Sequence, residues 1–305
     1  MAQILLKAAA FVCLIILGYV LKRKGFFAPD NYKILVKIVL NITMPCAAIV
    51  SFASYPPDFS LLVVSLLGFG MNCLMLMLAY FASRRSPRNI RAVWLNCVPG
   101  FNIGAFAMPF VQSFLSPASL VGTCLFDTGS ALMCNGTTYA ISRNVLDGTK
   151  GLNLKRIGHT LIRSVPFLTY ASLLIVTLVG LSIPQAVVNF VTPMSNANAF
   201  LAMFMVGMMF DLHIEKALFK DIAGILALRF SVGAIASALF YFCLPLPVEI
   251  RQALAIAVFA PASMTSTAFA VTASGDPAVA AGVNSASILI CIGCTLSLLA
   301  VFGVL

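Results

Sequence analysis

The sequence predicts an all-α membrane protein of ten transmembrane helices, arranged as two inverted five-helix repeats in which helices 4 and 9 are broken and cross. Three observations predict this fold: an apolar composition, the placement of the basic residues, and two proline-containing breaks. Of the 305 residues, 61% are hydrophobic and 9% are charged, and the mean hydropathy is +1.03. A soluble domain has about 25% charged residues and a span needs about 20 apolar residues, so the composition indicates roughly ten spans.

Ten apolar stretches are separated by short segments that contain Pro, Gly, Ser or Asp. They cover residues 4–21, 34–53, 60–82, 91–114, 118–141, 164–182, 190–210, 222–243, 252–273 and 278–303. The first stretch has the length of a signal peptide. No small-residue cleavage site precedes the cluster Lys22-Arg23-Lys24, so we interpret it as a span.

The basic residues lie almost entirely in or beside the loops that follow odd-numbered spans. Of the 19 lysines and arginines, 17 lie on that side, and only Lys7 and Arg251 lie opposite. Because basic loops remain in the cytoplasm, both termini are predicted to lie outside a plasma or bacterial inner membrane. The longest basic loop, 143–163, separates a first repeat, 1–142, from a second, 164–305. Five spans in each half make the halves enter the membrane from opposite sides.

Other functional classes find little support. The net charge of +10 follows the topology, so no nucleic-acid partner is expected. The cysteines lie almost wholly in predicted spans and indicate no disulfide framework. Cys291 and Cys294 have no second pair nearby, and His159 and His213 lie in predicted loops, so no metal site is expected. Without a Walker motif, we expect no direct use of ATP. The sequence also lacks a second acid beside Asp127 and a histidine within a predicted span, and we expect no enzymatic activity and no cofactor.

Two predicted spans are interrupted by proline and small polar residues, at Val98–Pro109 and Ala260–Ala270. In lipid, an interrupted helix is tolerated only where protein or a water-filled cavity compensates the free backbone groups. Matched breaks in two halves point to a transporter's central site, and helix N-termini stabilise an anion such as a carboxylate. The candidate substrate-binding residues are Pro99, Asn102, Gly104, Pro109, Pro261, Ser263, Thr265 and Ser266.

Asp127 is the only acidic residue deep within a predicted span, and Ser130 and Cys134 share its helical face. Intramembrane carboxylates usually face a cavity or a partner, so Asp127 is the candidate for coupling to a proton or another cation. The alternative is a carboxyl group held by helix–helix hydrogen bonds. Asp127-Thr-Gly-Ser130 also matches the aspartic protease tetrapeptide, but that chemistry needs a second carboxylate, and we interpret the match as chance.

Arg229 lies about two turns into span 8. We interpret it as a residue that extends to the membrane interface rather than as a substrate clamp or a partner of Asp127. Asn72, Asn96 and Asn284 are interpreted as packing residues.

Asn102 with Gly104 and Pro109, the Pro261-centred ninth span and the five-plus-five layout resemble the auxin efflux carrier family. This family includes plant auxin exporters and bacterial permeases for malonate and other small organic acids. In its layout, the resemblance covers the whole chain. In its motifs, it is limited to the predicted spans 4, 5 and 9. Asp127 resembles the aspartate pattern in span 5 of the bacterial members. The chain differs from plant members in the Gly100-Phe101 insertion before Asn102 and in lacking their long cytoplasmic loop.

The resemblance implies an elevator-type secondary transporter for a small organic anion, such as a mono- or dicarboxylate, working by alternating access. The expected partners are this substrate and membrane lipid, with a homodimer as an open alternative. A lone carboxyl group in an apolar span suits a proton better than a permanent charge, so Asp127 is expected to couple transport to protons. A sodium-coupled symporter of the bile-acid type, a membrane-embedded hydrolase and a receptor with a transporter fold are the alternatives.

Overall fold

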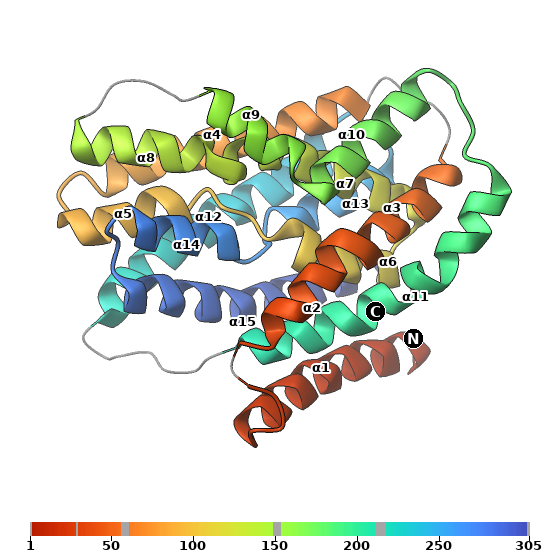
Figure 1. Cartoon of the computed structure of the whole chain (residues 1–305), viewed down its shortest axis with the longest axis horizontal. Coiled ribbons are helices and arrows are strands. Elements are labelled where there is room, and N and C mark those ends of the chain that lie inside the picture. Colours follow the sequence, from red (N-terminus) through yellow and green to blue (C-terminus); the bar gives the residue numbers. More distant parts are fainter. Residues whose placement is uncertain (1, 29, 56–60, 149–153, 211–217, 304–305) are drawn as a thin grey trace.

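The computed structural model describes all residues except 1, 29, 56–60, 149–153, 211–217 and 304–305. Helices make up most of the described chain (Figure 1). Among these residues, extended chain segments pair only at an isolated antiparallel bridge between Phe101 and Ala262. The predicted all-α class is confirmed.

The helices of the first half lie over the first five predicted spans. They are α1 (Ala2–Arg23), α2 (Tyr32–Ile38), η1 (Val39–Thr43), α3 (Met44–Ala53), α4 (Leu61–Ala82), α5 (Arg88–Cys97), η2 (Ile103–Ala107), α6 (Met108–Phe114), α7 (Pro117–Leu132), η3 (Met133–Thr137) and α8 (Thr138–Asp147). The η elements are π-helical turns within longer helices.

The helices of the second half lie over the remaining five, apart from α9, which lies in the predicted loop 143–163. They are α9 (Leu154–Ile162), α10 (Val165–Leu178), α11 (Gln185–Met209), α12 (Phe219–Cys243), α13 (Val248–Ala257), α14 (Met264–Thr272) and α15 (Pro277–Val301). Helices α4, α8, α12 and α15 run roughly along the long axis of the described chain, whereas α2–α3 and α11 run obliquely to it (Figure 1). In Figure 1 the α4–α5 and α14–α15 connections lie at the left end, whereas α1 starts and α15 ends toward the right.

Four helical segments among the described residues are long and apolar enough to cross a membrane. They are Tyr32–Ala53, Leu62–Ala82, Phe219–Cys243 and Pro277–Val301. The apolar helices Ile103–Phe114 and Val165–Leu178 are shorter.

Two of the π-helical turns are followed directly by a Met-Pro pair. Thr43 precedes Met44-Pro45, and Ala107 precedes Met108-Pro109. Proline lacks an N–H donor and its ring clashes with the carbonyl four residues earlier, which accounts for a widened turn. Pro109 therefore lies inside a continuous helix, and the break predicted over Val98–Pro109 ends at Asn102.

The segment 143–163 is not the continuous loop that the sequence predicted. Helix α8 continues to Asp147, where an ion pair from Arg143 Nε to Asp147 Oδ2 of 2.7 Å spans one helical turn. Gly148 then ends the helix with φ of 68°, a conformation that glycine adopts without steric cost. A second helix, α9, occupies Leu154–Ile162.

Small residues bring α1 and α11 into close contact. A Cβ atom added to Gly18 would overlap the carbonyl oxygen of Phe204, and one added to Gly207 would overlap that of Ile15. Within lipid, helices associate through such close packing because burial of apolar surface adds little driving force.

Candidate functional site

Both predicted helix breaks are present, and the two broken segments cross. Helix α5 ends at Cys97 and η2 starts at Ile103, while α13 ends at Ala257 and α14 starts at Met264. The extended residues between them pair at the Phe101–Ala262 bridge.

Two backbone hydrogen bonds fix the register of this crossover. Asn102 N–H donates to the carbonyl of Pro261 at 2.9 Å, and Ser263 N–H donates to the carbonyl of Gly100 at 3.2 Å. The backbone groups released by each break are thus partly satisfied by the other break, which is what membrane depth requires.

Gly100 is needed for the close approach at the crossover. A Cβ atom added to Gly100 would lie 2.5 Å from Ser266 Cβ, far inside van der Waals contact. Ser266 is buried and packs against Gly100.

Helix α15 supports the second break. The hydroxyl of Ser287 accepts a hydrogen bond from Ala262 N–H at 3.0 Å and donates to the Asn284 carbonyl at 2.8 Å. Both Ala262 and Ser287 are fully buried.

Arg229 lies at the centre of the crossover, and its interpretation as an interfacial residue is wrong. Its side chain is 1% exposed and donates to four backbone carbonyls. Its guanidinium carbon lies 4.5 Å from the ring centroid of Phe101. These carbonyls hold the guanidinium inside the protein. The position of Arg229, about two turns into its helix, would equally have allowed the side chain to extend to the membrane interface.

A cavity of about 120 Å³ lies beside the crossover. Four of the predicted site residues line it: Asn102, Gly104, Asp127 and Ser263. Cys134, which shares the helical face of Asp127, lines it too, as do residues from segments that the sequence did not connect with the site, including Leu40, Met44, Phe167 and Tyr170.

Asn102 and Ser263 hold equivalent positions in the two breaks. Asn102 is the N-cap residue of η2, and Ser263 is the N-cap residue of α14. Neither side chain accepts a capping hydrogen bond from its own helix. The first N–H groups of a helix have no intrahelical acceptor, so both helix starts present donors toward the cavity region.

Asp127 faces the cavity from α7 and is partly buried. A Cβ atom added to Gly104 would lie 3.4 Å from Asp127 Oδ2 and 2.8 Å from Met44 Sδ, so the glycine keeps space beside the carboxyl group. Among the described residues, no side chain forms an ion pair with Asp127.

The other predicted site residues lie away from the cavity. Pro99 is buried in the first break, and Pro109 is buried in α6. Pro261 takes part through its carbonyl, which accepts from Asn102 and Arg229. Thr265 is exposed on α14.

The three asparagines interpreted as packing residues lie within the helix bundle. Asn72 Nδ2 donates to Ser130 Oγ at 3.0 Å, between α4 and α7. Asn96 Nδ2 donates to Ser142 Oγ at 2.9 Å, between α5 and α8. The backbone carbonyl of Asn284 accepts from Ser287.

The sequence did not predict a buried network of side-chain hydrogen bonds between Thr43, Gln112, Ser195 and Asn198. Thr43 Oγ1 donates to Asn198 Oδ1 at 2.8 Å, Asn198 Nδ2 donates to Gln112 Oε1 at 2.8 Å, and Gln112 Nε2 donates to the Ser195 carbonyl at 3.0 Å. It joins η1, α6 and α11. Gln112 and Asn198 are polar residues within apolar stretches, and this pattern could have indicated the network.

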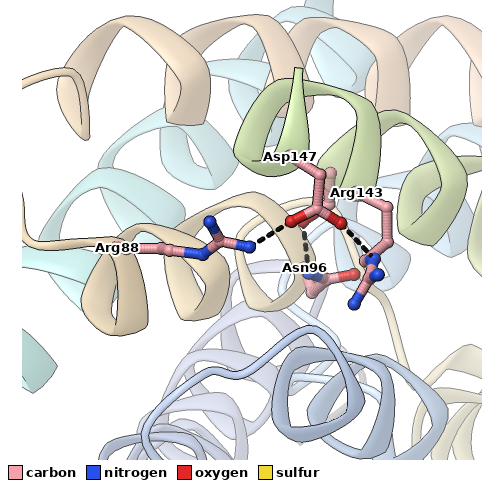
Figure 2. Close-up of polar contacts among 5 residues, drawn as sticks. Arg88, Asn96, Arg143 and Asp147 are labelled. Carbon is pink, nitrogen blue, oxygen red and sulfur yellow. Dashed lines mark hydrogen bonds and ion pairs between the residues drawn. The ribbon is translucent and has the colours of Figure 1, made fainter. Parts of the chain in front are cut away.

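At the end of α8, Asp147 lies between two arginines. Figure 2 shows its carboxylate paired with Arg88 at the start of α5 and with Arg143 on its own helix. The cluster ties the first turn of α5 to the last turn of α8 and so positions these two helices.

Two comparisons with known proteins bear on the family of the chain. No curated relative matches the chain significantly. Residues 4–149 match the family model described as membrane transport protein. This segment contains the first break, Asn102, Gly104 and Asp127. The match covers just under half of the chain and supports the predicted resemblance to the auxin efflux carrier family.

Proposed function

We propose that the protein is a secondary transporter of a small organic anion, and that the anion binds in the cavity beside the crossover. The observation that carries this proposal is the shared position of Asn102 and Ser263. Each is the N-cap residue of a half-helix, and both line one cavity.

The electrostatics of the cavity favour an anion. A helix N-terminus carries roughly half a positive charge, and its free N–H groups bind carboxylates and phosphates. The amide of Asn102 and the hydroxyl of Ser263 add two side-chain donors. The volume of about 120 Å³ suits a small carboxylate better than a large amphipathic substrate.

Asp127 gives the site a means of coupling to protons. An anion in the cavity would lie beside this carboxyl group, and two negative charges at close range repel each other. A proton on Asp127 removes this repulsion, so anion binding and proton binding support one another. Release of the proton then favours release of the anion, and release of the anion favours release of the proton.

The helix contacts support an alternating-access mechanism of the elevator type. Helix α11 packs on α1 and α3, and α3 also packs on α10, which forms one group. The broken segments pack with α4, α7, α12 and α15 in a second group. The cavity is lined by both groups, through Met44 and Tyr170 on one side and Asn102 and Asp127 on the other. Movement of the second group against the first would expose the site to each side of the membrane in turn.

This proposal also assigns the topology. The basic connection between α4 and α5 would face the cytoplasm, and the start of α1 and the end of α15 would face outward. The charge asymmetry of the loops supports this orientation.

Ligand binding to purified protein tests the proposal. Malonate, succinate and acetate should raise the apparent melting temperature, because a ligand that binds only the folded state stabilises it. Malonamide, which has a similar size and no charge, is the matched control. A shift with malonamide equal to that with malonate would contradict an anion site, as would the absence of a shift across a wide panel of small carboxylates.

A further inference from the structure

We propose that the Arg229 guanidinium is a built-in cation at the crossover, in the place that a coupling sodium ion would otherwise fill. Arg229 thus makes the transporter independent of sodium. The inference rests on the proposed transport function and extends it to ion coupling.

The guanidinium binds the C-terminal ends of both half-helices, one nitrogen to each. Nη1 donates to the carbonyls of Cys97 at 2.9 Å and Val98 at 2.5 Å, at the end of α5. Nη2 donates to the carbonyls of Ala260 at 2.7 Å and Pro261 at 3.1 Å, just beyond α13. The planar fork of arginine matches this two-sided arrangement, whereas a lysine ammonium is a single point of charge.

The charge of Arg229 is balanced by helix ends rather than by an acid. Each helix C-terminus carries roughly half a negative charge, so the two ends together offset about one positive charge. The ion pairs among the described residues do not include Arg229. Arginine stays protonated in proteins, so the cation at this position is permanent.

These carbonyls form the kind of oxygen cluster that binds a coupling ion in transporters with broken helices, where half-helix C-termini and unwound backbone coordinate sodium. Here the side chain, itself 1% exposed, already occupies the cluster. A sodium ion at the same point would lose these oxygen ligands and would meet a fixed positive charge.

The built-in cation also serves the anion site. Phe101 connects the guanidinium with the cavity, since its ring centroid lies 4.5 Å from the guanidinium carbon and Phe101 is one of the residues that line the cavity. Arg229 thus places a permanent positive charge behind the helix starts at Asn102 and Ser263. Because Arg229 offsets the negative ends of α5 and α13, the positive helix starts at Asn102 and Ser263 are the uncompensated ends that meet the anion.

The test measures the melting temperature of purified protein in sodium, lithium, potassium or choline chloride at equal ionic strength. For the parent protein we expect the same melting temperature in sodium and in choline. In Arg229→Met the four carbonyls lose their donor, so sodium, lithium or added guanidinium should raise the melting temperature by about 2–4 °C or more. Arg229→Lys retains a charge and should stay insensitive to sodium. Arg251→Met is the matched control, because Arg251 also donates to a helix carbonyl, that of Tyr241 at 2.9 Å.

A sodium-specific shift in the parent would overturn the inference. So would an Arg229→Met variant that responds to none of these cations, or an Arg229→Lys variant that responds to sodium as Arg229→Met does. If Arg229→Met does not purify as folded protein, Arg229→Gln takes its place. None of these measurements uses a transported substrate, so a failure to bind carboxylates would contradict the proposed function and leave this test unaffected.

Discussion

Asn102 and Ser263 begin two different half-helices, and their side chains line one cavity. Asn102 N–H bonds to the Pro261 carbonyl, and Ser263 N–H bonds to the Gly100 carbonyl, so each residue is held by the other broken segment. Neither side chain caps its own helix. The crossover therefore aims two helix starts and two polar side chains at one volume, an arrangement that neither half of the chain can make alone.

Asn102→Ala should weaken anion binding more than Asn72→Ala does. Asn102 lines the cavity, whereas Asn72 is buried and donates to Ser130. Loss of one hydrogen bond to a charged ligand costs roughly 1.5–3 kcal/mol, which is about tenfold or more in affinity. Titration calorimetry with the best carboxylate from the thermal-shift panel measures the difference. Equal affinities for the two variants, at equal folded fraction, would remove Asn102 from the site.

Gly100→Ala should destabilise the crossover by about 1–3 kcal/mol, as overpacking of a tight contact does. The added Cβ would collide with Ser266, and the double variant Gly100→Ala/Ser266→Gly should recover part of the loss. Thermal unfolding in detergent provides the readout. Gly70→Ala is the control, because a Cβ added there has no neighbour within 4 Å. Additive losses in the double variant would show that the two residues do not compete for space.

The sequence was sufficient to predict the two breaks and part of the cavity. Pro99 and Pro261 mark the breaks because proline cannot donate a backbone hydrogen bond. Asn102 and Asp127 were found because polar groups in apolar stretches are costly unless they have a use.

Other features depend on long-range contacts that no local pattern contains. The register between Phe101 and Ala262 joins residues far apart in the chain. Arg229 was misassigned because an arginine at this position of α12 can either extend to the membrane interface or bind buried carbonyls, and the sequence does not distinguish the two. Tyr170 and Met44 resemble ordinary apolar residues of a span until folding brings them to the cavity.

Asp127→Asn should abolish the response of transport to an imposed pH gradient, because an amide cannot bind and release the proton. Flux in proteoliposomes with imposed pH or sodium gradients measures this for the parent and the variant. We expect the parent to respond to the pH gradient alone. Sodium-dependent flux that survives Asp127→Asn would refute proton coupling through this residue.

Reporter fusions test the predicted orientation. A fusion after Leu305 should be active on the outer side, and one inserted near Gly148 should be active in the cytoplasm, because 17 of the 19 basic residues lie on one side of the predicted topology. The opposite pattern would invert the topology and exchange the two entrances of the site.

Counterflow of a labelled small carboxylate in proteoliposomes tests the central claim most directly. The parent protein should exchange external label for the same unlabelled carboxylate inside, and the double variant Asn102→Ala/Ser263→Ala should lose most of this exchange. The control variant Asn72→Ala should retain it. If the double variant exchanges the carboxylate as fast as the parent at equal reconstitution, the anion does not pass through the crossover cavity, and the account is wrong.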